Sequence, residues 1–207
     1  MSSAIRSNPS EAADDQSLGW RPRVATGVIV LADGAVIEGF GVGAAGSAAG
    51  EVCFNTAMTG YEEILTDPSY AAQIVTFTFP HIGIVGVNDE DIEVVNAAGS
   101  AAVGAIMRAD ISEPSNFRSL ARLDGWLKAR GIIGVTGVDT RALTTLIRKH
   151  GMPNAVIAHA PDGAFDLDAL RAKAAHWPGI DGMDLVPAVG STPVSYTHLT
   201  LPTIYSV

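Results

Sequence analysis

The order of the apolar runs along the chain constrains the fold more than any other feature of the sequence. Residues 24–31 are apolar and rich in β-branched side chains, and residues 35–40 resume this character after Asp33 and Gly34. Asp-Gly between two such runs is a strong signal for a β-hairpin. Predicted strands dominate the first half of the chain, whereas strands alternate with helices in the second half. This order predicts an α/β fold with a mixed sheet.

Further short strands are expected wherever an apolar run is bounded by turn residues, at 51–55, 73–79, 82–87, 101–107, 132–135 and 154–160. In the first of these, Val52 and Phe54 should share one face and Cys53 should point to the other, because successive side chains of a strand alternate. Residues 41–50 hold mainly glycine and alanine, and we expect them to form a connection.

About three helices are expected, all in the second half of the chain. The first, from about residue 116 to 129, carries an apolar stripe at helical spacing made of Phe117, Leu120, Leu123 and Leu127. Asp139 and Asp166 are suited to cap the other two helices, which should end near Gly151 and His176. The helix after Asp139 should bury Leu143, Leu146 and Ile147. A further short helix or turn is expected at 58–65.

The charge balance excludes whole classes of partner. The chain carries 13 Lys and Arg residues against 22 Asp and Glu residues, which gives a net charge of -9. Proteins that bind nucleic-acid phosphates or anionic membranes need a basic surface, so we expect neither partner. The single cysteine excludes an internal disulfide and fits a reducing, cytoplasmic compartment. Residues 1–23 lack apolar periodicity and should form a disordered tail.

The residues with reactive side chains form no complete catalytic or metal-binding pattern. The five histidines are His81, His150, His159, His176 and His198. No two of them have the spacing that is typical of metal ligands. Cys53 lies in the middle of a predicted strand, which favours a structural role. Glu62 and Glu63 are adjacent and would diverge on a helix, so we interpret them as a solvated pair. We therefore expect no catalytic residue, metal site or cofactor in this chain.

Three glycines raise an alternative. Gly41, Gly43 and Gly46 spell the G-x-G-x-x-G pattern of a dinucleotide site. That pattern works only when a helix begins at the third glycine, and residues 47–50 leave no room for one before the next strand. A tightly turning loop is the preferred interpretation. A free-standing nucleotide-binding domain or enzyme built on this loop stays open as the alternative.

One stretch is far more specific than any of these patterns. Residues 50–70, GEVCFNTAMTGYEEILTDPSY, closely resemble the signature of the small subunit of glutamine-dependent carbamoyl phosphate synthetase. Further segments similar to that family follow in its order, at residues 73–75, 80–83, 137–144, 147–148 and 182–185. Together the matching segments span roughly residues 24 to 190.

This resemblance implies a layered β/β/α, swivelling-type N-terminal domain over residues 24–192. The domain would dock on the large subunit and pack against a C-terminal glutaminase domain, whose Cys-His-Glu triad releases ammonia from glutamine. The large subunit, with ATP and Mg²⁺, would combine the ammonia with bicarbonate into carbamoyl phosphate for arginine and pyrimidine synthesis. The serine of the Asp-Pro-Ser-Tyr motif, here Ser69, would reach the glutamine pocket.

Two features depart from the pattern of this family. Ile84 stands where the family usually has asparagine after Ile-Gly. Residues 193–207 contain no Asp, Glu, Lys or Arg and resemble nothing in the family, so we expect them to be an artefactual tail. Because no segment matches the glutaminase triad, we expect the glutaminase domain to be absent and the chain alone to be inactive.

Overall fold

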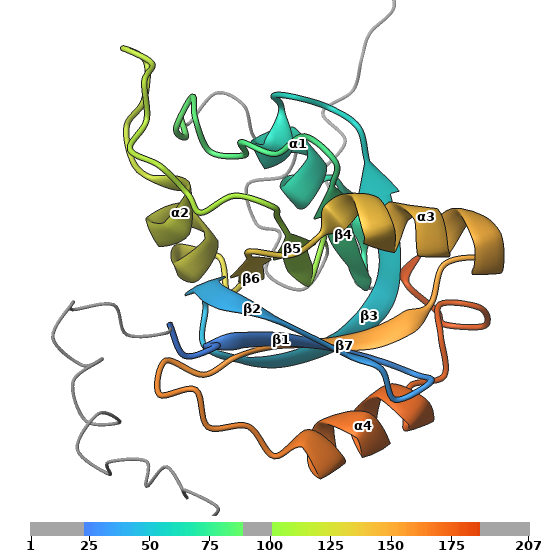
Figure 1. Ribbon diagram of the computed structural model, residues 1–207. Helices are drawn as coiled ribbons and strands as arrows, with labels where there is room; N and C mark the ends of the chain where they lie inside the picture. Colours follow the sequence, from blue (N-terminus) through green and yellow to red (C-terminus); the bar gives the residue numbers. More distant parts are fainter. Residues whose placement is uncertain (1–22, 89–100, 187–207) are drawn as a thin grey trace, which may run out of the picture.

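The computed structural model describes residues 23–88 and 101–186 (Figure 1). The tails expected at residues 1–23 and 193–207 lie outside the described residues, apart from Arg23.

Seven strands form one sheet in the described residues: β1 (Gly27–Leu31), β2 (Val36–Gly43), β3 (Gly46–Asn55), β4 (Gln73–Phe77), β5 (Gly104–Ile106), β6 (Ile133–Thr136) and β7 (Asn154–His159). Residues 23–88 and 101–186 also form four α-helices and one 3-10 turn: α1 (Tyr61–Thr66), η2 (Pro68–Tyr70), α2 (Leu123–Ala129), α3 (Thr140–His150) and α4 (Leu167–His176). The expected α/β class and mixed sheet are therefore confirmed.

The sheet closes on itself as a barrel in the strand order β1-β2-β6-β5-β4-β3-β7. Strands β3, β4, β5 and β6 run parallel to their neighbours among themselves, whereas β1, β2 and β7 make antiparallel pairs. The separate β/β/α layers expected from the resemblance are not confirmed by this closed arrangement.

The barrel interior is filled by side chains from every part of the sheet. They belong to one buried cluster, which includes Ile29, Val52, Ile74, Ile106, Val135 and Ile157. Leu143 and Ile147 of α3 join this cluster, so the buried face of α3 packs on the barrel interior. Gly104 lets the interior pack tightly, because a Cβ added there would lie 2.8 Å from Cγ2 of Ile157 on the non-adjacent strand β7.

Helices α1 and α2 lie on one side of the barrel and α4 on the opposite side (Figure 1), and a further buried cluster lies beneath the helices of each side. Cys53, Val75 and Phe77 pack beneath Tyr61 of α1 and Leu127 of α2. On the other side, α4 packs on β1 and β7 in a smaller cluster made of Val28, Val30, Val156, Ala158 and Ala174. The predicted alternation in β3 is confirmed, since Val52 and Phe54 face the interior cluster and Cys53 faces the outer one.

The helix expected at 116–129 begins only at Leu123, so its predicted apolar stripe is wrong in the first half. Phe117 is 97% exposed and Leu120 is 68% exposed. The amide of Leu120 donates to the carbonyl of Val87 at 2.8 Å, a long-range bond that is incompatible with a helical turn at this point. Leu123 and Leu127 are fully buried, as expected.

The strand expected at 82–87 is also wrong. This segment forms turns, with Gly83 at φ 91° and Gly86 at φ 72°. Glycine reaches such positive values without the steric cost that other residues carry, so the two glycines bend a run that the apolar pattern marked as extended. The connection expected at residues 41–50 is wrong as well. All of these residues except Ala44 and Ala45 belong to strands β2 and β3.

The helix caps expected from the sequence are confirmed. The carboxylate of Asp139 accepts from the amide of Ala142 at 3.2 Å, and that of Asp166 accepts from the amide of Ala169 at 3.0 Å. Gly151 follows α3 at φ 85°.

Candidate functional site

Ser69 lies in the middle of η2, the 3-10 turn that follows α1. Its side chain is exposed, and its hydroxyl makes no hydrogen bond within the described part of the chain. The backbone amide of Ser69 donates to the carboxylate of Asp67 at 2.8 Å, and Pro68 occupies the first position of the turn. Proline fixes φ near the value that such a turn needs. The turn therefore presents a free hydroxyl on a constrained backbone.

The end of β3 fixes the other side of this turn. The Nδ2 of Asn55, the last residue of β3, donates to the hydroxyl of Tyr70 at 3.0 Å. The Oδ1 of the same amide accepts from the backbone amide of Ala57 at 2.7 Å. Tyr70 is half-buried and packs against the outer core of α1 and α2. No sequence pattern pointed to this pair, although Asn55 and Tyr70 both lie in the stretch of residues 50–70 that carries the family resemblance.

Helix α1, which precedes this turn, is held by hydrogen bonds to residues 86 and 88. Tyr61 is 1% exposed, and its hydroxyl donates to the carbonyl of Gly86. Glu62 is only 4% exposed, and its carboxylate accepts from the amide of Asn88 at 3.1 and 3.2 Å. The interpretation of Glu62 and Glu63 as a solvated pair is therefore wrong, because Glu62 is buried and the Oε2 of Glu63 is also buried, with no hydrogen-bond partner in the described residues. The Glu62 carboxylate ties α1 to the turns at residues 83–88.

Ile84, the departure from the family pattern, lies on these same turns. Its side chain is 38% exposed, and its carbonyl accepts from the amide of Ser115 at 2.8 Å. The backbone hydrogen bond is available to any residue at this position, and the partly exposed isoleucine side chain offers no hydrogen-bonding group in place of the amide of asparagine.

Cys53 has none of the features of a reactive thiol. Its side chain is buried in the outer core, and burial, assisted by the charge of Glu51, raises its pKa to about 12. A thiol needs to ionise near neutral pH to act as a nucleophile. The structural role expected for Cys53 agrees with this environment.

The nucleotide-loop alternative is wrong. Gly41 and Gly43 lie within β2, and Gly46 begins β3 rather than a helix. The amide of Gly43 donates to the carboxylate of Asp124 at 2.6 Å, which takes up a donor that a phosphate would require. A Cβ at Gly41 would lie 2.0 Å from the ring of His159, so close packing explains this glycine.

One polar cluster away from this turn is paired internally. A cavity of about 270 Å³ holds Arg23, Asp110 and Thr136. Arg23 donates to Asp110 at 2.6 Å, and this hydrogen bond lowers the pKa of the Asp110 carboxyl. Within residues 23–88 and 101–186, no group of three or more His, Cys, Asp or Glu side chains could hold a metal ion. No helix in the same residues is long and apolar enough to cross a membrane.

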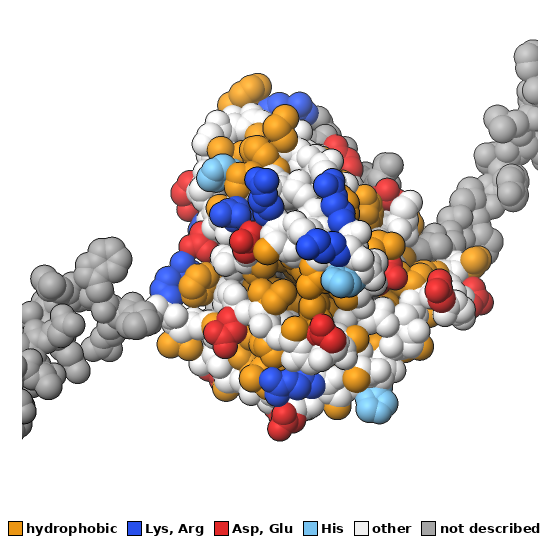
Figure 2. Space-filling model, turned by 45° about the vertical axis from the view of Figure 1, so that its right-hand side comes forward, with side chains coloured by type: hydrophobic (Ala, Val, Ile, Leu, Met, Phe, Trp, Pro, Cys, Tyr) orange, Lys and Arg blue, Asp and Glu red, His pale blue; other side chains and the backbone are white. Residues whose placement is uncertain are grey.

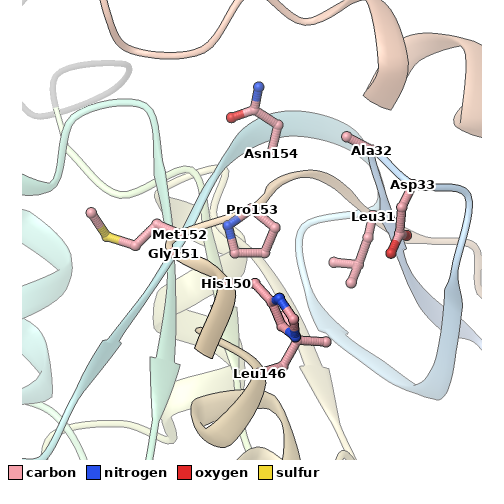
Figure 3. Close-up of a pocket in the computed structure, with 9 residues that line it drawn as sticks. All are labelled: Leu31, Ala32, Asp33, Leu146, His150, Gly151, Met152, Pro153 and Asn154. Atoms are coloured by element: carbon pink, nitrogen blue, oxygen red, sulfur yellow. The ribbon is translucent and has the colours of Figure 1, made fainter. Parts of the chain in front are cut away.

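A larger cavity of about 500 Å³ lies where α3 ends and β7 begins. Leu31 lines it from the end of β1 and Asp33 from the β1–β2 turn, and Leu146 and His150 line it from α3 (Figure 3). Figure 2 shows this side of the molecule, where hydrophobic side chains lie below a group of lysines and arginines. Ser69 does not line this cavity, so the structure does not bring the two features together.

Comparison with known proteins gives a consistent result. Residues 29–157 match the family model described as carbamoyl-phosphate synthase small chain, CPSase domain. The carbamoyl phosphate synthase small chain of Bradyrhizobium diazoefficiens is 65% identical over 178 residues, which are 86% of this chain and 45% of that protein. The small chain of Mesorhizobium japonicum is 64% identical over 173 residues, 83% of this chain and 44% of that protein. The chain thus spans less than half the length of these curated relatives.

Among solved structures, an aminopeptidase from Aneurinibacillus sp. strain AM-1 superposes with a TM-score of 0.38 at 17% identity, over 65% of this chain and 30% of that one. A similarity at this level supports no statement about fold or function.

Proposed function

This chain belongs to the carbamoyl-phosphate synthase small-chain family, and on that premise we propose that residues 24–192 are the N-terminal module of the small subunit of the glutamine-dependent synthetase. The module docks on the large subunit and completes the glutamine pocket of a glutaminase domain. The holoenzyme, a cytoplasmic ligase, uses ammonia from glutamine with bicarbonate and ATP to make carbamoyl phosphate for arginine and pyrimidine synthesis.

One observation carries the glutamine-binding part of this proposal. Ser69 combines an exposed hydroxyl that has no partner in the described residues with a backbone that Asp67 and Pro68 hold in place. A hydroxyl can both donate and accept, so it suits the carboxylate or the ammonium group of an amino acid. A constrained group also loses little freedom when the ligand binds.

In this proposal, the hydrolysis of glutamine and the use of ATP take place in other parts of the assembly. The only cysteine in the sequence, Cys53, is buried with a pKa of about 12, so it supplies no nucleophile for glutamine. The proposal therefore makes the chain alone inactive as a glutaminase and leaves ATP and Mg²⁺ to the large subunit. Its partners are the large subunit, the glutaminase domain and glutamine.

The test uses a full-length small chain in which residues 24–186 replace the matching domain of the Bradyrhizobium protein. With the large subunit from the same organism, carbamoyl phosphate synthesis is measured with glutamine or with ammonium as the nitrogen source. We expect Ser69→Ala to raise the KM for glutamine about two- to tenfold, the effect of one lost hydrogen bond, and to leave ammonium-dependent synthesis unchanged.

Ser112→Ala, which removes the hydroxyl of another exposed serine, is the control and should change neither rate. An unchanged KM in Ser69→Ala removes the Ser69 hydroxyl from the pocket. Loss of ammonium-dependent synthesis in that variant assigns Ser69 to assembly or folding instead.

A further inference from the structure

We propose that Tyr70 and Asn55 are positioning residues for Ser69, and that their hydrogen bond sets the affinity of the site for glutamine. The inference rests on the proposed role of Ser69. Tyr70 directly follows Ser69 in η2, and Asn55 ends β3, so one hydrogen bond of 3.0 Å joins the turn to the barrel.

The direction of this hydrogen bond is determined by its surroundings. A backbone amide only donates, so the amide of Ala57 requires the Oδ1 of Asn55, which it contacts at 2.7 Å. The Nδ2 of Asn55 is then left to donate to the hydroxyl of Tyr70. Both ends of the Asn55 amide are thus engaged, and the side chain cannot rotate without losing two hydrogen bonds.

The backbone on both sides of Ser69 is held as well. The amide of Tyr70 donates to the carbonyl of Asp67, and that of Ala71 donates to the carbonyl of Pro68, both at 3.0 Å. Ala72 has φ 60°, the only positive value for a non-glycine residue in the described chain. Alanine disfavours this conformation, and it persists only where the surrounding structure imposes it. Here the carbonyl of Ala72 accepts from the amide of Glu51 at 3.1 Å.

These contacts hold the turn in place around the Ser69 hydroxyl, which makes no hydrogen bond within the described residues. A group that is displaced by a fraction of an ångström forms weaker hydrogen bonds with its ligand. Tyr70 and Asn55 therefore act on glutamine through Ser69, and neither needs to touch the ligand.

The test uses the same full-length chimera with its large subunit. Tyr70→Phe keeps the half-buried ring and removes only the hydroxyl that accepts from Asn55. We expect it to raise the KM for glutamine about two- to tenfold, with kcat and ammonium-dependent synthesis unchanged. Asn55→Ala should act in the same direction. Asn55→Asp should keep the KM near the parent value, because a carboxylate accepts from Ala57 and the Tyr70 hydroxyl can donate to it.

Tyr61→Phe is the matched control, since it also removes a hydroxyl bonded to another residue, at the opposite end of α1. It should alter the melting temperature and leave the KM for glutamine unchanged. If it raises the KM as much as Tyr70→Phe does, the effect is general loosening and the inference is wrong.

The remaining outcomes separate this inference from the proposed function. A raised KM in Ser69→Ala with an unchanged KM in Tyr70→Phe keeps the function and overturns the positioning role. If Tyr70→Phe raises the KM for glutamine and Ser69→Ala does not, the Ser69 hydroxyl does not bind glutamine, and Tyr70 cannot act on glutamine through it. No effect of either substitution overturns both. If Asn55→Asp is as impaired as Asn55→Ala, the hydrogen bond between the pair is not what matters.

Discussion

At the scale of single residues, the environment of a side chain decides whether its chemistry is available. Cys53 and Ser69 both lie in the stretch of residues 50–70 that resembles the family signature, yet Cys53 is buried in the outer core and Ser69 is exposed. Alternation along β3 was enough to predict the face of Cys53. Ser69 was identified by its motif alone. Its hydrogen-bonded surroundings could not be predicted, because Asn55 and Tyr70 meet only after the chain has turned through α1.

The buried thiol predicts a pH dependence of stability. The pKa of Cys53 rises from 9.0 to about 12 on folding, mainly because burial disfavours the thiolate. Below pH 9 the thiol is protonated in both states. Between pH 9 and about 12 only the folded chain keeps the proton, so the free energy of unfolding should fall as the pH rises.

Urea unfolding of the parent and of Cys53→Ala at pH 7 and at pH 10.5 (roughly the middle of that interval) checks this prediction. The variant should be less stable at pH 7 and should lose less stability between the two values, because it lacks the titrating thiol. Equal losses in the two proteins would show that Cys53 ionises as readily when folded as when unfolded.

At the scale of elements, sequence patterns predicted the structure correctly where it depends on neighbouring residues. They were wrong where it depends on contacts between distant residues. Asp139 and Asp166 cap α3 and α4 as predicted, since a cap depends on residues two or three positions away. The helical pattern at residues 116–122 does not form a helix, because the backbone amide of Leu120 donates to the distant carbonyl of Val87. In α3, Leu143 and Ile147 are buried as predicted, whereas Leu146 is only half-buried and lines the larger cavity.

The start and the buried face of α3 can be tested separately. Asp139→Ala should lower the free energy of unfolding by about 1 kcal/mol, because it leaves the amide of Ala142 without its acceptor. Leu143→Ala should lower it by about 2–5 kcal/mol, because it opens a cavity where α3 packs on the barrel interior. Leu146→Ala should cost less than Leu143→Ala, since its side chain is not fully enclosed. Chemical denaturation measures all three.

Asp139→Asn separates the cap from the exposed ion pair that Asp139 makes with Arg108 at 3.3 Å. Asparagine caps as well as aspartate but carries no charge, and an exposed pair contributes only about 0–1 kcal/mol. Its stability should therefore lie near the parent value. If Asp139→Asn is as unstable as Asp139→Ala, the charge rather than the cap stabilises α3.

At the scale of the whole molecule, the defining event is the closure of the sheet. Strand β7 pairs with β1 and with β3, and so joins the last strand of the barrel to two of the first three. The sequence predicted most of these strands but not their closure, because the order of strands depends on pairings between distant residues. Closure also places Gly104 of β5 against Ile157 of β7, two strands that are not neighbours in the sheet.

This contact across the interior predicts that two harmful substitutions compensate each other. Ile157→Ala should cost about 2–5 kcal/mol, because it leaves a cavity in the barrel. Gly104→Ala should also destabilise, because its Cβ would lie 2.8 Å from Cγ2 of Ile157 and 3.2 Å from the carbonyl oxygen of Ile133. In the double variant the new methyl group occupies space that the shortened side chain has vacated. The two losses should therefore sum to more than the loss measured in the double variant. The carbonyl of Ile133 stays in place, so compensation should be partial.

Denaturation of the parent, both single variants and the double variant gives the coupling free energy, with Ile157→Val as a milder control at about 0.5–1.5 kcal/mol. Strictly additive losses would mean that β5 and β7 do not meet inside a closed barrel.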